Sequence, residues 1–379
     1  MTDRRTRRRN RHFRRVAQAL DAVLLRHEQG EAPSVSFDPG AGGLIIFSDQ
    51  HKGARDGADD FRKAERAYNA ALAYYLELGH TLVELGDVEE LWEETPGVVI
   101  DRYPRTFGLL RKFQAAGRYW RIFGNHDDLW SFPDAVARHL RPVIGSDLQV
   151  HESVVLKLAT EAGTFRILLL HGHQGSLLSD GYSFLSRVLV RVLWRPLQRL
   201  TGWSPNTPAR SWDLRNAHNQ ALHRWASRQS DLLLIAGHTH EPVFVGGSRA
   251  EQLQRAIAEH KAAAKDQPSG AGSKAGPGGG KTAADGHLAQ LKAELEWVLA
   301  ERSSEETDDG ASEEPPSNAY FNTGCCCYRD GDITGLEIAD GRIQLIRWPD
   351  DGAAPNPKVL ASADFDEVLA GLRGTAAPR

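Results

Sequence analysis

Residue types that bind metal ions follow five short apolar segments of the chain. The segments are residues 44–48, 81–85, 119–123, 165–170 and 232–236. The side chains that come directly after them are carboxylates, a carboxamide and imidazoles: Asp49, His51, Asp87, Asn125, His126, Asp127, His171, His173, His238 and His240. Such oxygen and nitrogen donors suit hard-to-borderline ions, Mn first and then Fe, Zn or Mg, rather than thiophilic ones.

The five segments have the length of β-strands, and this predicts where the metal-type residues meet. In open α/β sheets, ligands bind in the crevice outside the carboxyl ends of the strands. Two metal ions roughly 3.5–4 Å apart in such a crevice hold a bridging hydroxide and clamp a phosphoryl oxygen. A carboxylate that bridges the two ions must offer both of its oxygens, so one aspartate is expected at the centre.

The elements that position these residues alternate along the chain. Helical patterns cover residues 12–28, 59–78 and 106–117, and they alternate with the apolar strands. This βαβ rhythm predicts an α/β fold with a largely parallel sheet. Two hairpins are also expected, one joining residues 150–159 to 165–170 and one joining 333–338 to 342–348.

The composition divides the chain into a main domain with additions. We expect a basic N-terminal tail and helix in residues 1–40, a main domain in residues 41–348 and a C-terminal tail in residues 349–379. Residues 177–230 read as a helical cap insertion. Residues 246–317 read as a second, partly disordered insertion, because residues 262–286 are of low complexity.

The five ligand clusters form an ordered set of motifs. They read Asp49-Gln50-His51, Gly86-Asp87-Val88-Glu89-Glu90, Gly124-Asn125-His126-Asp127, His171-Gly172-His173 and Gly237-His238-Thr239-His240. In this order they resemble the signature of the calcineurin-like metallophosphoesterase superfamily. The resemblance implies an α/β fold of two packed mixed β-sheets flanked by helices, with a helical cap insertion. It also implies hydrolysis of phosphate esters or anhydrides by a hydroxide that bridges two metal ions.

The resemblance also implies a role for each residue. The first metal ion would take Asp49, His51, Asp87 and His240. The second would take Asp87, Asn125, His171 and His238, with Asp87 as the bridge. His126 would assist the leaving oxygen, and Asp127 would orient His126. His173 is read as structural or substrate-binding, and Glu90 as a solvated charge at the start of a helix.

The substrate is expected to depend on the cap. Arg191 and Arg195 belong to a set of arginines spaced four residues apart, and they are candidate substrate-binding residues. A helix of this kind either docks on an anionic membrane or lipid-linked substrate, or packs on the domain with its arginines in solvent. The arrangement is similar to the family that cleaves the pyrophosphate of UDP-2,3-diacylglucosamine. Phosphodiester or pyrophosphate bonds are favoured, with a nuclease and a non-catalytic metal-binding scaffold as alternatives.

Charge and cysteine content limit the partners and the compartment. Eight of the first fifteen residues are Arg, although the whole chain has a net charge of −4. This cluster reads as a flexible tail, and nucleic acid is disfavoured because Phe13 is its one aromatic residue. No signal-like or membrane-spanning apolar run is present. The three cysteines, Cys325 to Cys327, read as buried small hydrophobes in a reducing cytoplasm, and the protein as cytoplasmic or peripheral to the membrane.

Overall fold

A computed structural model describes residues 2–160, 163–175, 208–245, 247–265, 283–300, 318–350 and 356–373. The helices of these ranges are α1 (Thr2–Glu28), α2 (Phe61–Glu77), α3 (Pro96–Arg102), α4 (Pro104–Ala115), α5 (Pro133–Ala135), α6 (Arg141–Ile144), α9 (Pro208–Ala226), α10 (Arg249–Lys265), α11 (Ala283–Ala300) and α12 (Phe365–Gly371). Short 3₁₀ and π segments at Asp128–Ser131 and Val136–Leu140 lie on either side of α5.

The strands form two mixed sheets of seven strands each. One sheet has the order β1-β6-β7-β8-β11-β9-β10, formed by Ser34–Ser36, Ser153–Thr160, Gly163–Leu170, Leu232–Ala236, Tyr320–Asn322, Val243–Phe244 and Gly247–Ser248. The other has the order β14-β13-β12-β2-β3-β4-β5, formed by Lys358–Asp364, Arg342–Trp348, Ile333–Ala339, Leu44–Phe47, Thr81–Leu85, Tyr119–Ile122 and Val150–His151. The five predicted strands and the pairing of both predicted hairpins are confirmed, but residues 150–151 form β5 of the other sheet and not the start of the first hairpin. The strands belong to two mixed sheets, as the resemblance implies, and not to one largely parallel sheet.

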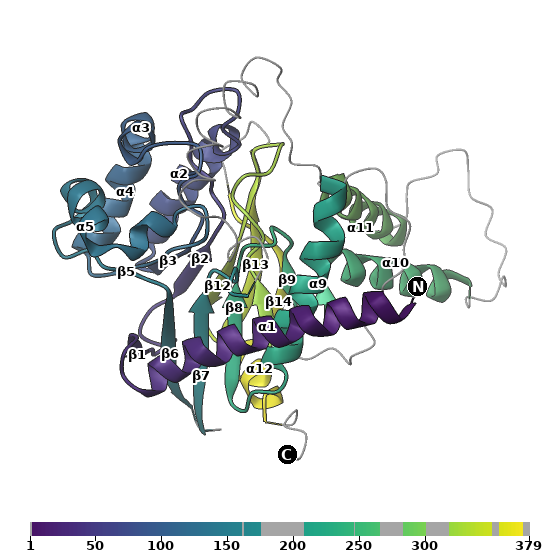
Figure 1. The fold of residues 1–379 in the computed structure, drawn as a ribbon. Helices are drawn as coiled ribbons and strands as arrows, with labels where there is room; N and C mark the ends of the chain where they lie inside the picture. Colours follow the sequence, from purple (N-terminus) through teal and green to yellow (C-terminus); the bar gives the residue numbers. More distant parts are fainter. Residues whose placement is uncertain are drawn as a thin grey trace, which may run out of the picture.

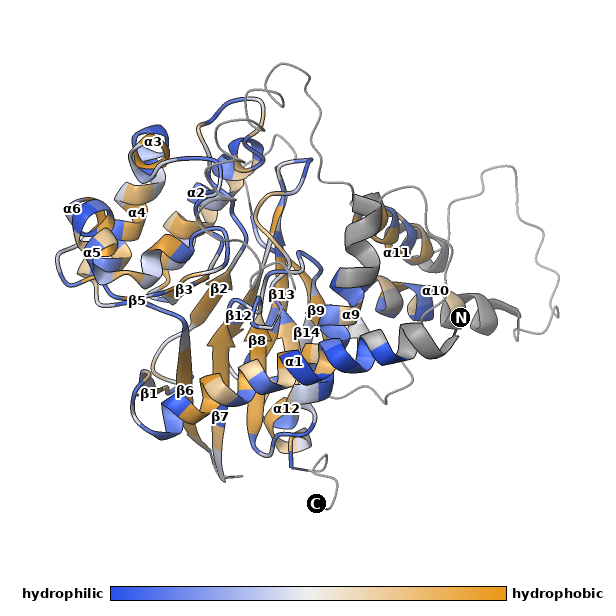
Figure 2. Ribbon diagram, viewed as in Figure 1, coloured by the Kyte–Doolittle hydropathy of each residue, from blue (hydrophilic) through white to orange (hydrophobic). Residues whose placement is uncertain are grey.

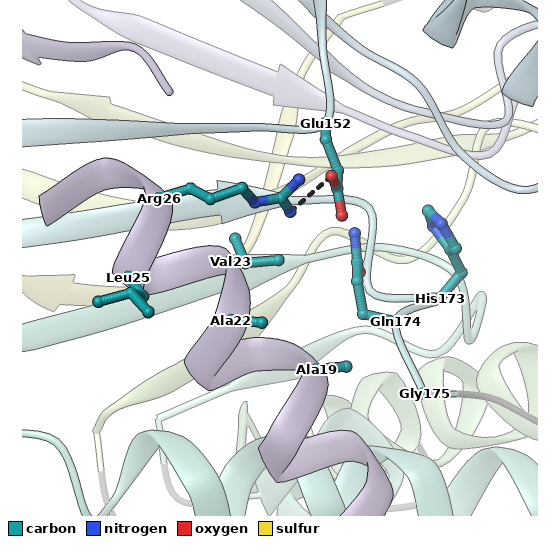
Figure 3. Close-up of a pocket in the computed structure, with 9 residues that line it drawn as sticks. All are labelled: Ala19, Ala22, Val23, Leu25, Arg26, Glu152, His173, Gln174 and Gly175. Carbon is teal, nitrogen blue, oxygen red and sulfur yellow. Dashed lines mark hydrogen bonds and ion pairs between the residues drawn. The ribbon is translucent and has the colours of Figure 1, made fainter. Parts of the chain in front are cut away.

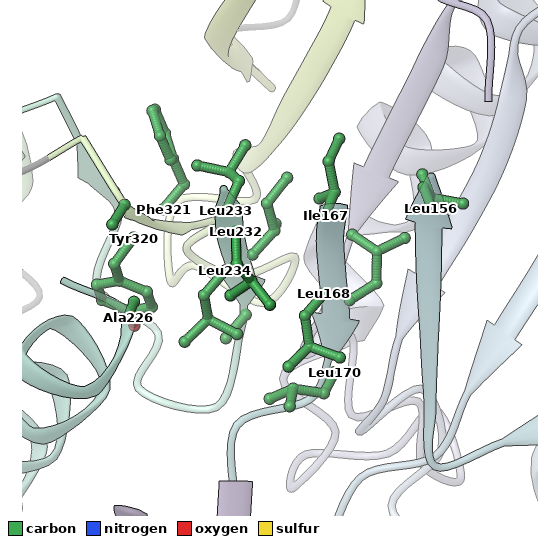
Figure 4. Packing of buried hydrophobic residues seen from close by; sticks show 14 of the residues in the cluster. Leu156, Ile167, Leu168, Leu170, Ala226, Leu232, Leu233, Leu234, Tyr320 and Phe321 are labelled. Carbon is green, nitrogen blue, oxygen red and sulfur yellow. The ribbon is translucent and has the colours of Figure 1, made fainter. Parts of the chain in front are cut away.

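The core lies between the two sheets and continues under the helices on their outer faces. Successive residues of β2 point to opposite faces, so Leu44 and Ile46 pack toward the first sheet, whereas Ile45 and Phe47 pack against helices. The buried residues of β6, β7, β8 and β11 pack with Ala226 of α9 (Figure 4). Figure 2 shows the strands as largely hydrophobic, as burial on both faces requires.

Helices cover the outer face of each sheet (Figure 1). Helices α2 and α4 pack on the sheet that contains β2, β3 and β4. Helices α1 and α9 contact each other beside the sheet that contains β6 and β7. They are joined by hydrogen bonds from Trp225 Nε1 to Asp21 and between the rings of His218 and His12, over 2.7 and 3.2 Å. The protein is therefore an α/β fold of two mixed sheets flanked by helices.

Both ends of the chain are more ordered than the sequence predicts. Helix α1 begins at Thr2 instead of near residue 12, and its buried face includes Val16 and Leu20. The expected C-terminal tail contains β14, which pairs with β13, and α12, whose Phe365 and Val368 enter the core. The sequence did not predict β14, because this strand lies at the edge of its sheet and most of its residues are exposed or only partly buried. It therefore lacks the apolar run that marks the buried strands.

The two expected insertions are described in part. In residues 177–230 the described part is α9, which packs in the core through Leu222 and Trp225. Arg191 and Arg195 lie outside the described residues. In residues 246–317 the described parts are β10, α10 and α11. None of the described helices combines the length and apolar character needed to span a lipid bilayer.

Candidate metal centre

The loops after β2, β3 and β4 run side by side and hold the first ligands. The N–H of His51 donates to the carbonyl of Asp87 over 2.9 Å, so the loop after β2 continues the pairing of β2 with β3. The N–H of His126 donates to Asp87 Oδ1 over 2.8 Å and fixes the loop after β4. These contacts orient Asp87 from two neighbouring loops.

The loops of the other sheet join the first three across the gap between the sheets. The N–H of Gly237 donates to the carbonyl of His171 over 2.9 Å, so the loops after β7 and β8 are paired. The N–H of His238 donates to Asp49 Oδ2 over 2.9 Å and links the two sheets. A Cβ at Gly237 would collide with Ser48 and Asp49, so only glycine allows this approach.

The backbone is strained where ligands are expected. Eight non-glycine residues of the described chain have positive φ, and five of them are predicted ligands: Asp49, His51, Asp87, His238 and His240. Their φ values lie between 50 and 69°, the left-handed region that costs L-residues free energy. Strain of this kind concentrates at functional sites, which makes these loop ends the candidate site.

The predicted ligands of the first metal ion lie together. Asp49, His51 and His240 form a group in which one ligand atom of each lies within 4.8 Å of the others. His240 Nε2 is 3.2 Å from both Asp49 Oδ1 and His51 Nε2. Two imidazole nitrogens and a carboxylate oxygen thus point at one position.

The predicted ligands of the second metal ion form another group, made by Asp87, His171 and His238. Asp87 Oδ2 is 3.0 Å from His171 Nε2 and 3.8 Å from His51 Nε2, so one carboxylate oxygen contacts both groups. Asn125, the remaining predicted ligand, is buried at the end of β4. Asp87 therefore has the central place of a bridging ligand, but it contacts both groups through Oδ2 alone, since Oδ1 accepts the N–H of His126, and not through both oxygens as the sequence predicts.

The hydrogen bonds around the ligands leave metal-binding atoms available. His171 Nδ1 donates to the carbonyl of Leu85 over 2.7 Å, which leaves the lone pair of Nε2 for a cation. Asn125 Oδ1 is buried and has no hydrogen-bond partner within the described residues, whereas Asp49 Oδ1 and His171 Nε2 contact other predicted ligands, His240 and Asp87. Buried polar atoms are normally bonded, so Asn125 Oδ1 fits a bound cation.

The electrostatics of the groups also favour cations. Among the described residues, Asp49, Asp87 and Glu90 form their ion pairs with histidines rather than with Lys or Arg. Burial lowers the pKa of His51, but Glu90, Asp87 and Asp49 outweigh burial and raise it to about 10. The pKa of His171 is raised to about 9 because Asp87 and Asp49 likewise outweigh burial. The site therefore attracts positive charge.

Glu90, not Asp127, is the carboxylate that contacts His126. His126 Nδ1 lies 2.8 Å from Glu90 Oε1, and Glu90 Oε2 lies 3.0 Å from His51 Nδ1. The expectation that Glu90 is a solvated helix-start charge is wrong, because Glu90 lies in a loop and its side chain is only 16% exposed. Trp92 stacks on His126, with ring centroids 4.0 Å apart.

Asp127 has a different place from the one the sequence predicts. Its carboxylate accepts hydrogen bonds from the N–H groups of Gly124, Asp87 and Val88, over 2.6, 3.2 and 3.0 Å. It thus holds the loops after β3 and β4 together and does not orient His126. The five-residue motif Gly86–Glu90 already contained Glu90, but only the fold shows which carboxylate reaches the imidazole.

His173 lies beside the second group of ligands and outside it. Its ring centroid is 5.5 Å from that of His171 and 6.4 Å from that of His238. It also lines a pocket of about 700 Å³ between α1 and the loop after β7 (Figure 3). Gln174 and the ion pair of Arg26 with Glu152 line the same pocket. His173 therefore lies near the second group of ligands and also lines this pocket, whose lining includes no predicted metal ligand.

The cysteines lie closer to the site than the sequence predicts. Cys325 and Cys326 are buried, as expected, but Cys327 is partly exposed. Cys327 Sγ is 3.8 Å from His240 Nδ1. The sequence did not indicate that the cysteines lie near the site, because they follow β11, a strand that contributes no residue to the five motifs.

A scan against models of protein families finds no family that matches this chain. A search of curated proteins likewise finds no match.

Proposed function

We propose that this protein is a binuclear metal-dependent phosphoesterase of the calcineurin-like kind. The observation that carries the proposal is the convergence of four strand ends, those of β2, β3, β7 and β8, from two sheets. They bring together two groups of oxygen and nitrogen ligands, and Asp87 contacts both. The strained backbone of five ligand residues and the buried Asn125 Oδ1, which has no hydrogen-bond partner among the described residues, support it independently.

The chain has residues to hold each ion. Asp49, His51, Asp87 and His240 would hold the first. Asp87, Asn125, His171 and His238 would hold the second. Two divalent ions, with Mn²⁺ first among the candidates, would supply a water of lowered pKa and positive charge for the phosphoryl oxygens.

His126 is assigned the proton transfer to the leaving oxygen. Glu90 contacts Nδ1 and Trp92 stacks on the ring, so the imidazole is held in one orientation and Nε2 is the nitrogen that exchanges the proton. Burial raises the pKa of Glu90, but His126 and His51 outweigh it and lower the pKa to about 2. Glu90 therefore stays ionised at neutral pH and holds His126 through a contact between a carboxylate and the ring nitrogen.

A general acid matters most when the leaving group is poor. We therefore infer that the substrate contains a phosphodiester or pyrophosphate bond, whose alkoxide or phosphate leaving group gains from protonation. The pocket beside His173 offers space next to the centre for an organic substituent of the substrate. Lipid-linked pyrophosphates, glycerophosphodiesters, cyclic nucleotides and single-stranded DNA form the panel that separates the substrate classes.

The test is hydrolysis of bis(p-nitrophenyl) phosphate by the full chain with added Mn²⁺. Activity that is lost with a chelator and restored by Mn²⁺ is expected. His126→Asn should lower kcat by about 10²–10⁴-fold on a phosphodiester of the panel with an alkoxide leaving group, and by less on bis(p-nitrophenyl) phosphate, whose nitrophenolate leaves without protonation. His139→Asn, a histidine outside the ligand groups, is the matched control and should leave kcat unchanged.

A metal-binding scaffold without turnover is the alternative. It predicts two bound metal ions per chain and no hydrolysis of any member of the panel with Mn²⁺, Fe²⁺, Zn²⁺ or Mg²⁺. That combination would overturn the proposed activity while leaving the metal centre intact.

A further inference from the structure

Two thiols lie against the side of His240 that faces away from Asp49. His240 Nε2 points toward Asp49 Oδ1, at 3.2 Å, and His240 Nδ1 lies 3.8 Å from Cys327 Sγ. Cys325 joins them, because one ligand atom each of His240, Cys325 and Cys327 lies within 4.8 Å of the other two. The imidazole therefore separates an oxygen-rich side from a sulfur-rich side.

The middle cysteine is turned away from this group. Cys326 Sγ lies 3.7 Å from the carbonyl of Thr334, within the core that β12 and α2 share. The N–H of Cys326 donates to the carbonyl of Asp49 over 3.1 Å and ties the segment to the loop after β2. This backbone contact holds the Cys325–Cys327 segment beside the ligand loops, and it places only two of the three thiols near His240.

The donor set differs in chemistry from the rest of the centre. Two sulfurs and an imidazole nitrogen suit soft and borderline ions, whereas carboxylates, carboxamide and imidazoles suit harder ones. Cysteine and histidine are the usual ligands of tetrahedral zinc. Cys327 and His240 are partly exposed, so an ion can enter and keep a water as its fourth ligand.

We propose that Cys325, Cys327 and His240 Nδ1 form a separate site for a thiophilic divalent cation, Zn²⁺ or its analogue Cd²⁺. Binding releases the thiol protons to solvent and forms two metal–sulfur bonds and one metal–nitrogen bond. Because His240 is shared, a cation on Nδ1 leaves the ring proton on Nε2, and Nε2 can bind an ion of the adjoining centre only if that proton is also released to solvent. That coupling rests on the proposed function, but the thiol site itself does not.

The test is a titration of the reduced, metal-free full chain with Cd²⁺, followed by the ultraviolet charge-transfer absorbance of cadmium–thiolate bonds. The expected result is a band that saturates at one Cd²⁺ per chain. Cys327→Ser should lower its intensity by about half or more, since one of two sulfur ligands is lost. Cys325→Ser should do the same, and Cys326→Ser is the matched control that should keep the full band.

Other outcomes overturn the proposal. No saturating band in the wild-type chain, or an unchanged band in Cys327→Ser, would exclude a site made by these thiols. Loss of the band only in Cys326→Ser would assign it to the core thiol. Asp87→Asn separates this proposal from the proposed function, because that variant should lose hydrolysis and keep the cadmium–thiolate band.

Discussion

Two groups of charged side chains lie next to each other in this protein, and they are balanced in different ways. The first is the metal centre. The second is here called the buried ion cluster, and its residues belong to β3, β4 and the loops that follow β2, β3 and β4. It consists of Lys52, Glu84, Glu89, Arg121 and Asp127. All five side chains are buried.

The buried ion cluster carries its own cations. Arg121 contacts Glu89 directly and lies 3.6 Å from Glu84 and 3.8 Å from Asp127. Lys52 Nζ lies 3.8 and 3.9 Å from the same two glutamates. In the metal centre, the carboxylates instead contact imidazoles, which carry charge only when protonated. Buried carboxylates need compensation, which the buried ion cluster receives from Lys52 and Arg121 of the chain, whereas the metal centre calls for added cations.

The sharpest test of this contrast is Asp87→Asn. Asparagine keeps an oxygen to accept the N–H of His126, but it removes the charge that contacts both ligand groups. We expect the fold to persist and turnover to fall by at least about 10³-fold, equivalent to about 4 kcal/mol in the activation free energy. Kinetics on bis(p-nitrophenyl) phosphate and metal analysis of the purified chain measure it. Retained turnover would show that Asp87 does not bridge.

Breaking the buried ion cluster should act on stability instead. Arg121→Met leaves Glu89, Glu84 and Asp127 without their main cation, and losing one partner of a buried pair costs about 3–5 kcal/mol. Denaturation by urea measures the loss in the free energy of unfolding. Arg111→Met on the exposed face of α4 is the control and should change little. Equal stability of the two variants would mean that the cluster is not structural.

Added metal should stabilise one group and not the other. Mn²⁺ at about 100 times its dissociation constant should raise the free energy of unfolding of the wild-type chain by about 2.7 kcal/mol for each ion bound. In Arg121→Met, Mn²⁺ should raise the free energy of unfolding by the same amount, although the value without Mn²⁺ is lower. In Asp87→Asn, Mn²⁺ should not raise the free energy of unfolding. Urea denaturation with and without Mn²⁺ compares the three. An increment of full size in Asp87→Asn would place the ion elsewhere.

The smallest expected effect is that of Glu90→Gln. The amide keeps a hydrogen bond to His126 but loses the charge that orients two imidazoles, so activity should fall by about 10–100-fold. The control is Glu77→Gln, exposed at the end of α2. An unchanged kcat in Glu90→Gln would leave Glu90 with no part in catalysis.

The sequence by itself determined where strands end and which residue types follow them. Apolar runs bounded by glycine and polar residues are local signals, and β2, β3, β4, β7 and β8 appear where they were expected. The types of ligand also follow from the sequence, because a side chain at a strand end keeps its chemistry whatever the packing. The order of those strands in the two sheets could not be predicted from local sequence patterns. It depends on pairing between strands that are distant in the sequence, such as β11 with β8.

Only the tertiary structure decided which neighbouring side chains serve the centre. Glu90 and Asp127 are both carboxylates beside ligand residues, yet Glu90 reaches His126 and Asp127 accepts three backbone N–H groups. Cys325 and Cys327 lie against His240, which is more than 80 residues away in the chain. The contact forms because β11 pairs in parallel with β8, so the loops that follow the two strands are neighbours. The direction of a side chain in a loop is set by the backbone torsions that long-range packing imposes, and no local pattern of residues records them.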